Sequence, residues 1–343
     1  MAEKSTMDPW RVDEANFPSQ ASFRDQLQFL LTYAVLAPSS HNTQPWLFRV
    51  HDAGVELHAD RTRALPVVDP EDRALIISCG AALYNLRVAI RHFGFTEVAQ
   101  LFPDASQPDL LARVSIGIPR QPTGDDNQRF SAIPLRRSNR QPFESRPVAQ
   151  ALIDRLVAAA SEESAWLAAV SGDETRNAVA DLVAEGDRTQ AASKPFRREL
   201  AAWMHHNRSR SRDGMPGYAH GMGELASLVG PFIIRTFDWG NGQAAKDRQL
   251  AVGSPLLAVL GTTSDDPQAW LAAGQALSSF LLLARAEGIH NSYLNQPIEV
   301  PELRPRLRDL IGRDGFPQIL VRLGYGPDTR PTPRREVSEV VVD

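Results

Sequence analysis

The chain has 343 residues, 43% of them hydrophobic and 23% charged, which is long and apolar enough to fold around a large core. Its formal net charge of −4 argues against general binding to nucleic acid or to a membrane surface. The single cysteine, Cys79, excludes a disulfide framework within the chain. Residues 1–18 read as an extended arm without the apolar core of a signal peptide, and no apolar stretch is long enough to span a bilayer. We therefore expect a cytoplasmic protein.

Up to residue 130, the pattern predicts two helices, three strands and a linker. Apolar residues recur with helical spacing in the first helix, and Pro38 ends it because the residue before a proline disfavours helical backbone. The second helix is longer and strongly apolar, and Gly94 is placed to end it. In chain order we expect a helix over 21–36, strands over 46–50 and 54–60 around a turn at 51–54, a helix over 71–93, a strand over 111–119 and a polar linker over 120–130.

Beyond the linker, the pattern predicts helices and strands around a long irregular middle, from about 161 to 250. Pro147 suits the first turn of a helix. The middle holds a basic stretch, SRSRDGMPG, which we interpret with the helix before it as a lid over a site; a plain surface loop is the alternative. In chain order we expect helices over 147–160 and 194–208, a strand over 254–263, a helix over 266–287 and a strand over 317–327.

The two strongly apolar helices repeat one another. Each is preceded by Asp-Pro, carries Gly-Ala-Ala-Leu or Gly-Gln-Ala-Leu, and ends at a glycine after the same spacing. Each then leads to a strand that closes with Gly-Ile-Pro or Gly-Tyr-Gly-Pro. Chance similarity between Gly- and Ala-rich helices is the alternative. We interpret the repeat as an internal duplication, in which small residues let the two helices pack closely.

This interpretation divides the chain into an N-terminal half, residues 1–125, and a C-terminal half, residues 126–343, with a lid-like insertion at about 190–225. One chain would then fold as its own pseudo-dimer. Further dimerisation stays open.

Two polar segments stand out as candidate binding sites. The stretch APSSHNTQPW, at 37–46, packs capping and turn residues behind a helix. The stretch RRSNR, at 136–140, places three arginines within five positions. Arginine suits phosphate because its planar fork donates two parallel hydrogen bonds and stays charged. Taken alone, such a short charge run is more often a solvated turn.

Four stretches together resemble the nitroreductase family of FMN flavoproteins: APSSHNTQPWLF at 37–48, RRSNRQPF at 136–143, NQPIE at 295–299 and GYGPDTRPTPRR at 324–335. The duplicated chain is similar to the Acg-type branch, in which one polypeptide holds two nitroreductase-like halves. The resemblance covers about residues 20–340 and implies an α+β, nitroreductase-like fold. It also implies an oxidoreductase that uses NAD(P)H to reduce FMN and then a nitro compound, a quinone or a similar small acceptor.

The resemblance implies a role for each matching residue around FMN. Arg140 would lie beside N1 and the C2 carbonyl of the flavin, where a fixed cation stabilises negative charge on the ring. Either Arg334 or Arg335 would close on the phosphate. The other implied contacts are Pro38, Ser39, Ser40 and Asn42 at the ring edge and ribityl chain, Arg136, Arg137 and Ser138 at the phosphate and ribityl chain, and Gln296, Pro297, Ile298 and Glu299 along the ring.

Comparison of the halves predicts one FMN per chain. Where the first half has PSSHN after its helix, the second half has AAASEESAWL, at 158–167. Where the second half has RRSNR before its helix, the first half has NFPSQASFR, at 16–24. Each half has lost what the other keeps, so one complete site is expected.

Two other functions stay open at this point. A lid over the flavin would favour a protein that sequesters or stores FMN with little turnover, and a third alternative keeps the fold without the cofactor. His41 is interpreted as a turn or surface residue. The pair His205-His206 lacks the further ligands of a zinc site, so no metal is expected.

Overall fold

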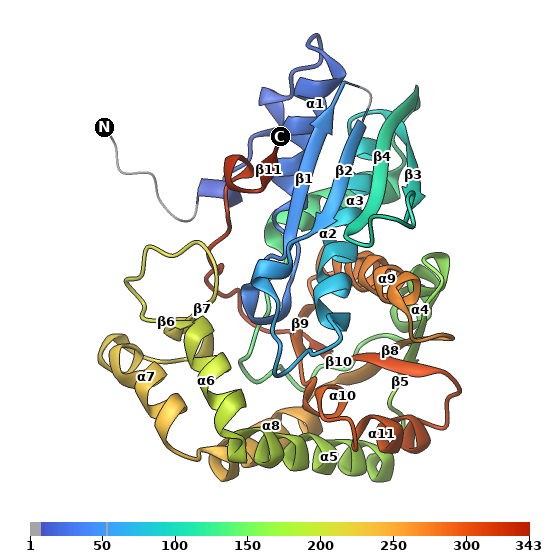
Figure 1. Ribbon diagram of the computed structural model, residues 1–343. Coiled ribbons are helices and arrows are strands. Elements are labelled where there is room, and N and C mark those ends of the chain that lie inside the picture. Colours follow the sequence, from blue (N-terminus) through green and yellow to red (C-terminus); the bar gives the residue numbers. More distant parts are fainter. Residues whose placement is uncertain (1–7, 53) are drawn as a thin grey trace.

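The computed structural model describes residues 8–52 and 54–343 and contains two antiparallel sheets with two long helices between them (Figure 1). The first sheet has the strand order β1-β2-β4-β3, and a short parallel strand, β11, extends it beside β1. Ala53, in the predicted turn, and residues 1–7 of the predicted arm lie outside the described residues. The strands of this sheet are β1 (Trp46–His51), β2 (Gly54–Ala59), β3 (Phe95–Leu101), β4 (Leu110–Pro119) and β11 (Val341–Val342).

The second sheet repeats the topology of the first. Its order is β5-β8-β10-β9, all antiparallel. In both sheets the strand that follows the long helix lies at the edge, and the last strand returns beside the strand that precedes the helix. The strands are β5 (Trp166–Ala169), β8 (Leu256–Thr262), β9 (His290–Tyr293) and β10 (Phe316–Gly324).

The long helices are α2 (Arg73–His92), which packs on the first sheet, and α9 (Pro267–Ala286), which packs on the second. They contact each other along much of their length. Both also meet the length and composition of a membrane span, which the sequence analysis did not foresee. However, 89% and 83% of their apolar windows are buried inside the protein, as is usual for the central helices of a folded core.

Most elements predicted from periodicity are present. The first helix is α1 (Phe23–Ala34), where the Ser22 hydroxyl caps the N-terminus by accepting from the Asp25 amide. The helix predicted over 147–160 is α4 (Gln150–Glu162). The α+β fold class is confirmed.

The linker predicted over 120–130 is wrong, because α3 (Gly124–Ala132) occupies it. Thr123 and Asp126 form a capping box that starts this helix. Its polar composition suggested a loop, but Phe130 and Ala132 are buried. The edge strand β3 was also missed, since most of its residues are exposed and show no alternation of burial.

The irregular middle predicted over 161–250 is largely helical, which corrects that expectation. Helices α5 and α8 lie side by side through small residues such as Ala180 and Ala244, so the usual large apolar stripe is weak. The helices here are α5 (Asp173–Ala192), α6 (Lys194–Trp203), α7 (Glu224–Thr236) and α8 (Gly240–Val252), with short strands β6 (Met204–His205) and β7 (Met215–Pro216).

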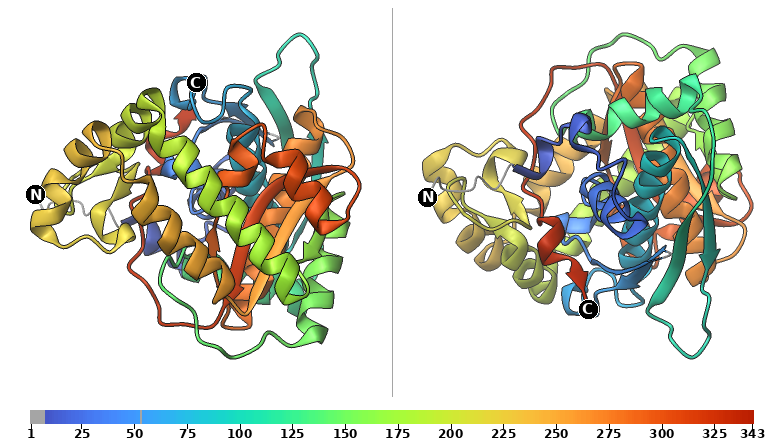
Figure 2. Two further views of the ribbon diagram at one scale, coloured as in Figure 1. Left: turned by 90° about the horizontal axis from the view of Figure 1, so that it is seen from below. Right: turned by 90° about the horizontal axis from the view of Figure 1, so that it is seen from above.

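We call residues 194–240 the lid segment; it is longer than the insertion predicted at about 190–225. Both views of Figure 2 show its yellow part on the side of the molecule away from strands β3 and β4. Two short helices, α10 (Gln296–Glu299) and α11 (Arg304–Ile311), complete the second sheet's outer layer.

Candidate functional site

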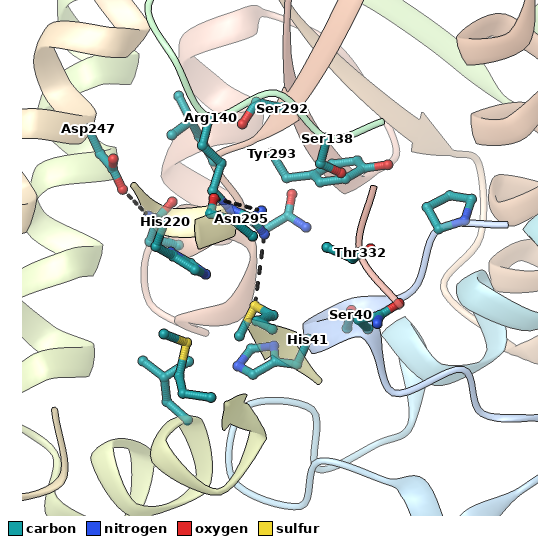
Figure 3. A pocket seen from close by; sticks show the side chains of 18 of the residues that line it. Ser40, His41, Ser138, Arg140, His220, Asp247, Ser292, Tyr293, Asn295 and Thr332 are labelled. Atoms are coloured by element: carbon teal, nitrogen blue, oxygen red, sulfur yellow. Dashed lines mark hydrogen bonds between the residues drawn. The ribbon is translucent and has the colours of Figure 1, made fainter. Parts of the chain in front are cut away.

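A cavity of about 710 Å³ is lined by residues from the N-terminal part of the chain, the C-terminal part and the lid segment. This volume is within the usual range for small-molecule sites. Figure 3 shows its walls, with Ser40 on one side and His220 and Asp247 on the opposite side. Residues from the α1–β1 loop, the RRSNR segment, the helices α5 to α8, the β9–α10 region and the C-terminal tail all line it.

Most residues implied by the family resemblance line this one cavity, although they come from four separate stretches of sequence. Pro297, Ile298 and Arg335 are not among them. Ile298 is buried in the core beneath the second sheet, and Arg335 donates instead to the carbonyls of Gln44 and Glu339. Those that line the cavity are Pro38, Ser39, Ser40, Asn42, Arg136, Arg137, Ser138, Arg140, Gln296, Glu299 and Arg334.

Three arginines at one end of the cavity have no carboxylate partner within residues 8–52 and 54–343. Arg136 is 2% exposed and donates only to the Leu36 carbonyl, at 3.2 Å. Arg137 donates to two backbone carbonyls. Arg334 is 4% exposed and donates to Asn42, Thr332 and Pro333 oxygens. Burying a guanidinium group without a counter-charge costs free energy, so this end of the cavity is suited to binding an anion.

The electrostatics of these arginines agree with that conclusion. Burial lowers the pKa of Arg334 well below its ordinary value, and the neighbouring Arg136 and Arg137 lower it further. Burial, again with Arg136, lowers the pKa of Arg137 to about 9. An anion placed among them would reverse this effect.

Trp10 covers the same arginines from the N-terminal side. The guanidinium of Arg137 lies 3.6 Å from the centre of its ring and that of Arg334 lies 4.8 Å from it. Its indole donates to the Thr332 carbonyl at 2.8 Å. The expected extended arm therefore contributes a buried aromatic ring that packs against two arginines of the site, which the sequence analysis missed.

Arg140 faces the cavity further along, where its hydrogen bonds to other described residues are weak. Its guanidinium lies 3.5 Å from the Ala219 carbonyl and 3.8 Å from the Met215 sulfur. Burial lowers its pKa. A cation with such poor protein partners is available to a bound molecule.

Arg322, in the middle of β10, is a further cation that sequence reasoning missed. It is fully buried and lines the cavity. One terminal nitrogen donates to the carbonyls of Asn139 and Gln141, which holds the RRSNR segment in place, while its other nitrogens have no partner within the described chain. The sequence signal for a functional role of Arg322 was its charge within a largely apolar strand, PQILVRLGYG.

The loop between α1 and β1 is held in a strained backbone conformation. His41, Asn42 and Gln44 have φ angles of 49°, 56° and 53°. Such strain in non-glycine residues persists only where surrounding contacts impose it. Gln44 supplies two of these contacts, since it donates to the Arg212 carbonyl and accepts from the Arg335 amide, each at 2.8 Å.

Asn42 joins three parts of the chain. Its amide nitrogen donates to the carbonyls of Gly214, in the lid segment, and Pro333, in the C-terminal tail. Its oxygen accepts from Arg334 at 2.7 Å. The side chain lines the cavity, but its hydrogen bonds are used within the protein.

On the wall opposite Ser40, which we call the far wall, two carboxyl groups accept hydrogen bonds from the same side-chain amide. The Gln296 nitrogen donates to Asp187 at 3.0 Å and to Asp247 at 2.9 Å. Burial and the neighbouring Asp247 raise the pKa of Asp187 from 3.8 to about 8. Asp187 is therefore protonated over much of the neutral range, and one of its oxygens has no partner among the described residues.

The two histidines in the cavity are neutral. Burial, with the nearby positive charge of Arg140, lowers the pKa of His41 to about 4 and that of His220 well below its ordinary value. On sequence alone, His41 is interpreted as a turn or surface residue. In the structure it lies in a turn that lines the cavity.

The lid side of the cavity is apolar. Three methionines and two aromatic residues contribute, and Met side chains adapt to varied partners. Within the described residues, no group of three or more His, Cys, Asp or Glu could hold a metal ion. The apolar side consists of Phe196, Leu200, Met204, Met215, Met222, Ile233, Ile234, Trp239 and Leu250.

Comparison with known proteins gives relatives that match almost the whole chain. Two Mycobacterium tuberculosis proteins carry names that begin "Putative NAD(P)H nitroreductase": Rv3131 is 33% identical over 331 residues, covering 95% of this chain and 92% of its own. The other, acg, is 29% identical over 327 residues, covering 92% and 95%. The M. tuberculosis protein Rv3127, named as uncharacterized, is 32% identical over 328 residues, covering 90% of each chain.

No family model matches the sequence. Among solved structures, the FMN and NADPH-dependent nitroreductase NfnB from Sphigopyxis sp. strain HMH aligns with a TM-score of 0.42 and 21% identity, over 63% of this chain and 97% of that one. That structural likeness is too low to carry an assignment, which rests on the full-length relatives. By its 33% identity to Rv3131 across 95% of its length, the chain belongs to the NAD(P)H nitroreductase family.

Proposed function

We propose that the chain binds one FMN in this cavity and acts as an NAD(P)H-dependent oxidoreductase, passing electrons to a small acceptor such as a nitro compound or a quinone. The observation that carries the proposal is the group of arginines at one end of the cavity, the buried Arg136 and Arg334 and the half-buried Arg137, which lack carboxylate partners in the described chain. A phosphate group supplies the missing charge and accepts the fork of donors that guanidinium groups present.

The rest of the cavity also fits FMN. Ser138 and Ser40 line it close to the arginine end and offer hydroxyl groups to a polyol chain. Arg140, Gln296 and the apolar lid residues line the remaining length, as a flat ring with polar edges requires. When bound, FMN would supply the hydride and electron transfer that no side chain provides.

Several residues of the chain would tune that chemistry. Arg140 would place positive charge where reduction adds negative charge to the ring, because its weak protein contacts leave it available. Protonation of Asp187 would reduce the negative charge on the far wall, where Asp247 also lies. The lid segment would exclude water from the ring and lower the local dielectric constant.

A single site per chain follows from the internal asymmetry. The matching order of strands in the two sheets supports duplication, with halves at 1–125 and 126–343, so the chain would act as a pseudo-dimer. The arginine cluster and the PSSHN loop meet once, in one cavity, and their counterparts at 16–24 and 158–167 have other sequences.

The second candidate function is sequestration of FMN with little turnover. It is favoured by the position of the lid segment, because Met215 and Ala219 line the cavity beside Arg140 and would cover a bound ring. Rapid access for NAD(P)H distinguishes the two functions.

The test is an absorption spectrum of the purified protein, quantification of released FMN per chain, and anaerobic addition of NADPH or NADH. About one FMN that bleaches within seconds would support the oxidoreductase. Bound FMN that stays oxidised would support sequestration. A protein that holds no FMN and takes none up on reconstitution would refute both.

A further inference from the structure

Helix α7 has its large apolar side chains on the outside. Leu225 is 81% exposed, Phe232 64% and Leu228 61%, and these residues recur at the spacing of one helix face. The same surface is extended by Val229 and Ile233 and by Phe237, which lies just beyond the end of the helix. We call these six residues the α7 face.

The buried side of α7 is formed by small residues. Ser227 is 1% exposed. Its hydroxyl donates to the backbone carbonyl of Glu224 and accepts from the backbone amide of Asn207. Gly230 lies on the same side and is also buried. A helix of a soluble protein usually shows the reverse arrangement, so the α7 face is built to contact something outside the chain.

The charge of the lid segment indicates what that partner is. Residues 194–240 contain seven Lys or Arg against four Asp or Glu, a formal net charge of +3 in a chain whose total is −4. Arg235 is exposed on α7. The Arg208 side chain is 82% exposed beside the N-terminus of the helix, where it pairs with Glu224 at 2.9 Å. A second copy of the chain would bring two positive lid segments together, whereas an anionic lipid surface complements them.

We propose that the α7 face, with the arginines beside it, docks on an anionic lipid surface. An apolar helix face flanked by basic residues is the pattern of helices that lie in the plane of a membrane interface. Figure 1 shows α7 at the left-hand edge of the molecule, where a flat surface can reach it. The overall negative charge, which argued against membrane binding, conceals this local positive region.

The position of α7 connects this surface with the cavity. Ile233 is part of the α7 face, with 44% of its surface exposed, and it also lines the cavity. Ile234 and Met222, which lie beside it, line the cavity too. Docking would therefore place the apolar lid side of the cavity next to the lipid. The docking itself does not depend on the proposed redox function.

The experiment is co-sedimentation of the full chain with vesicles of phosphatidylcholine alone and with about a third phosphatidylglycerol. We expect binding to the anionic vesicles that weakens as salt rises from about 50 mM to about 500 mM, since salt screens the arginines. The paired substitution Leu228→Gln and Phe232→Gln should reduce binding about tenfold or more, because two large apolar side chains would no longer enter the lipid. Both residues are exposed, so the fold should be retained, and circular dichroism checks that.

The matched control is Ile118→Gln, which removes a side chain that is 74% exposed on β4, far from the lid segment. It should bind vesicles as the unchanged protein does. A second variant, Arg235→Gln, should weaken binding to anionic vesicles only.

Three results would overturn the proposal. The first is no binding of the unchanged protein to anionic vesicles at about 50 mM salt. The second is equal binding by the paired variant, and the third is a concentration-dependent dimer that the paired variant abolishes. The last would assign the α7 face to a second copy of the chain.

Discussion

Gly80 of α2 and Gly274 of α9 face each other where the two central helices cross. A Cβ atom on Gly80 would lie 2.2 Å from the Leu271 carbonyl oxygen, and one on Gly274 would lie 2.0 Å from that of Ile77. These are the two glycines that occupy the same place in the sequence repeat. The repeat therefore has a structural cause, because only a residue without a side chain fits at this crossing on either helix.

The first prediction follows from that contact. Gly274→Ala should lower the free energy of unfolding by about 1–3 kcal/mol or more, since a methyl group would meet backbone that cannot move aside. Chemical denaturation measures it. Gly124→Ala is the control, because a Cβ there meets nothing within 4 Å. Equal stability of the two variants would show that the helices separate at little cost.

The second prediction distinguishes the two arginines that the sequence left open for the phosphate. Arg334 lines the cavity and Arg335 does not. Arg334→Gln should weaken FMN binding by roughly 10- to 100-fold, the usual effect of one hydrogen bond to a charged group. Arg335→Gln should change the affinity much less. Fluorescence titration of the apoprotein gives both values, and the opposite ranking would place the phosphate elsewhere.

The third prediction concerns Arg140. If Arg140 stabilises negative charge on the reduced ring, Arg140→Met should lower the midpoint potential of bound FMN by ~30–60 mV, which corresponds to ~1.5–3 kcal/mol for a two-electron couple. Arg140→Lys should recover part of the shift. Spectroelectrochemical titration measures the potential, and an unchanged value in the Met variant would remove Arg140 from this role.

The fourth prediction is a pH effect at Asp187. Its pKa is raised to about 8 in the folded protein, against an ordinary value of 3.8, so the folded state holds a proton that the unfolded chain has released. The contribution of this carboxyl group to the free energy of unfolding is therefore fully present below about pH 4 and is lost as the pH rises toward about 8. Thermal unfolding at pH 6 and pH 9 should show a smaller loss of stability in Asp187→Asn than in the unchanged protein.

Asp181→Asn is the control for that measurement, because Asp181 lies on the same helix but is exposed and paired with Arg248. It should lose as much stability between the two pH values as the unchanged protein. Identical behaviour of the Asp187 and Asp181 variants would contradict the raised pKa.

The sequence predicted the repeated parts of the fold and the positive end of the site. Local signals were sufficient for the fold elements, through helical spacing in α1, α2 and α9 and alternation in β1. Three arginines in five positions marked a candidate phosphate site, which became the preferred interpretation only with the family resemblance. The grouping of Arg136 with Asn42 and Arg334, far apart in sequence, came from the family resemblance rather than from any local pattern.

The walls contributed by the middle of the chain could not be predicted in the same way. His220 and Arg322 line the cavity from a short turn and a buried strand, and Trp10 covers two of its arginines from the terminal arm. No local pattern indicates the positions of Trp10 and His220, and the one local signal for Arg322 is its charge in a largely apolar strand. Helix α8 was missed because its buried side consists largely of Gly and Ala, which give no periodic apolar signal.

The last prediction tests whether the lid segment retains FMN. Arg63, which does not line the cavity, forms an ion pair with Asp213 in the lid segment, and its guanidinium lies over the Trp203 ring at 5.5 Å. Arg63→Gln should loosen the lid segment without removing a residue that lines the cavity, although it also removes the hydrogen bond from Arg63 to the Thr43 carbonyl in the α1–β1 loop. Release of FMN should become several-fold faster, consistent with an ion pair of about 1 kcal/mol. Stopped-flow fluorescence follows the release. Arg61→Gln is the matched control, because Arg61 lies in the same turn but pairs with Asp72 and Asp109, outside the lid segment. If both variants release FMN at the unchanged rate, the lid segment does not control the cofactor, and the sequestering function loses its structural basis.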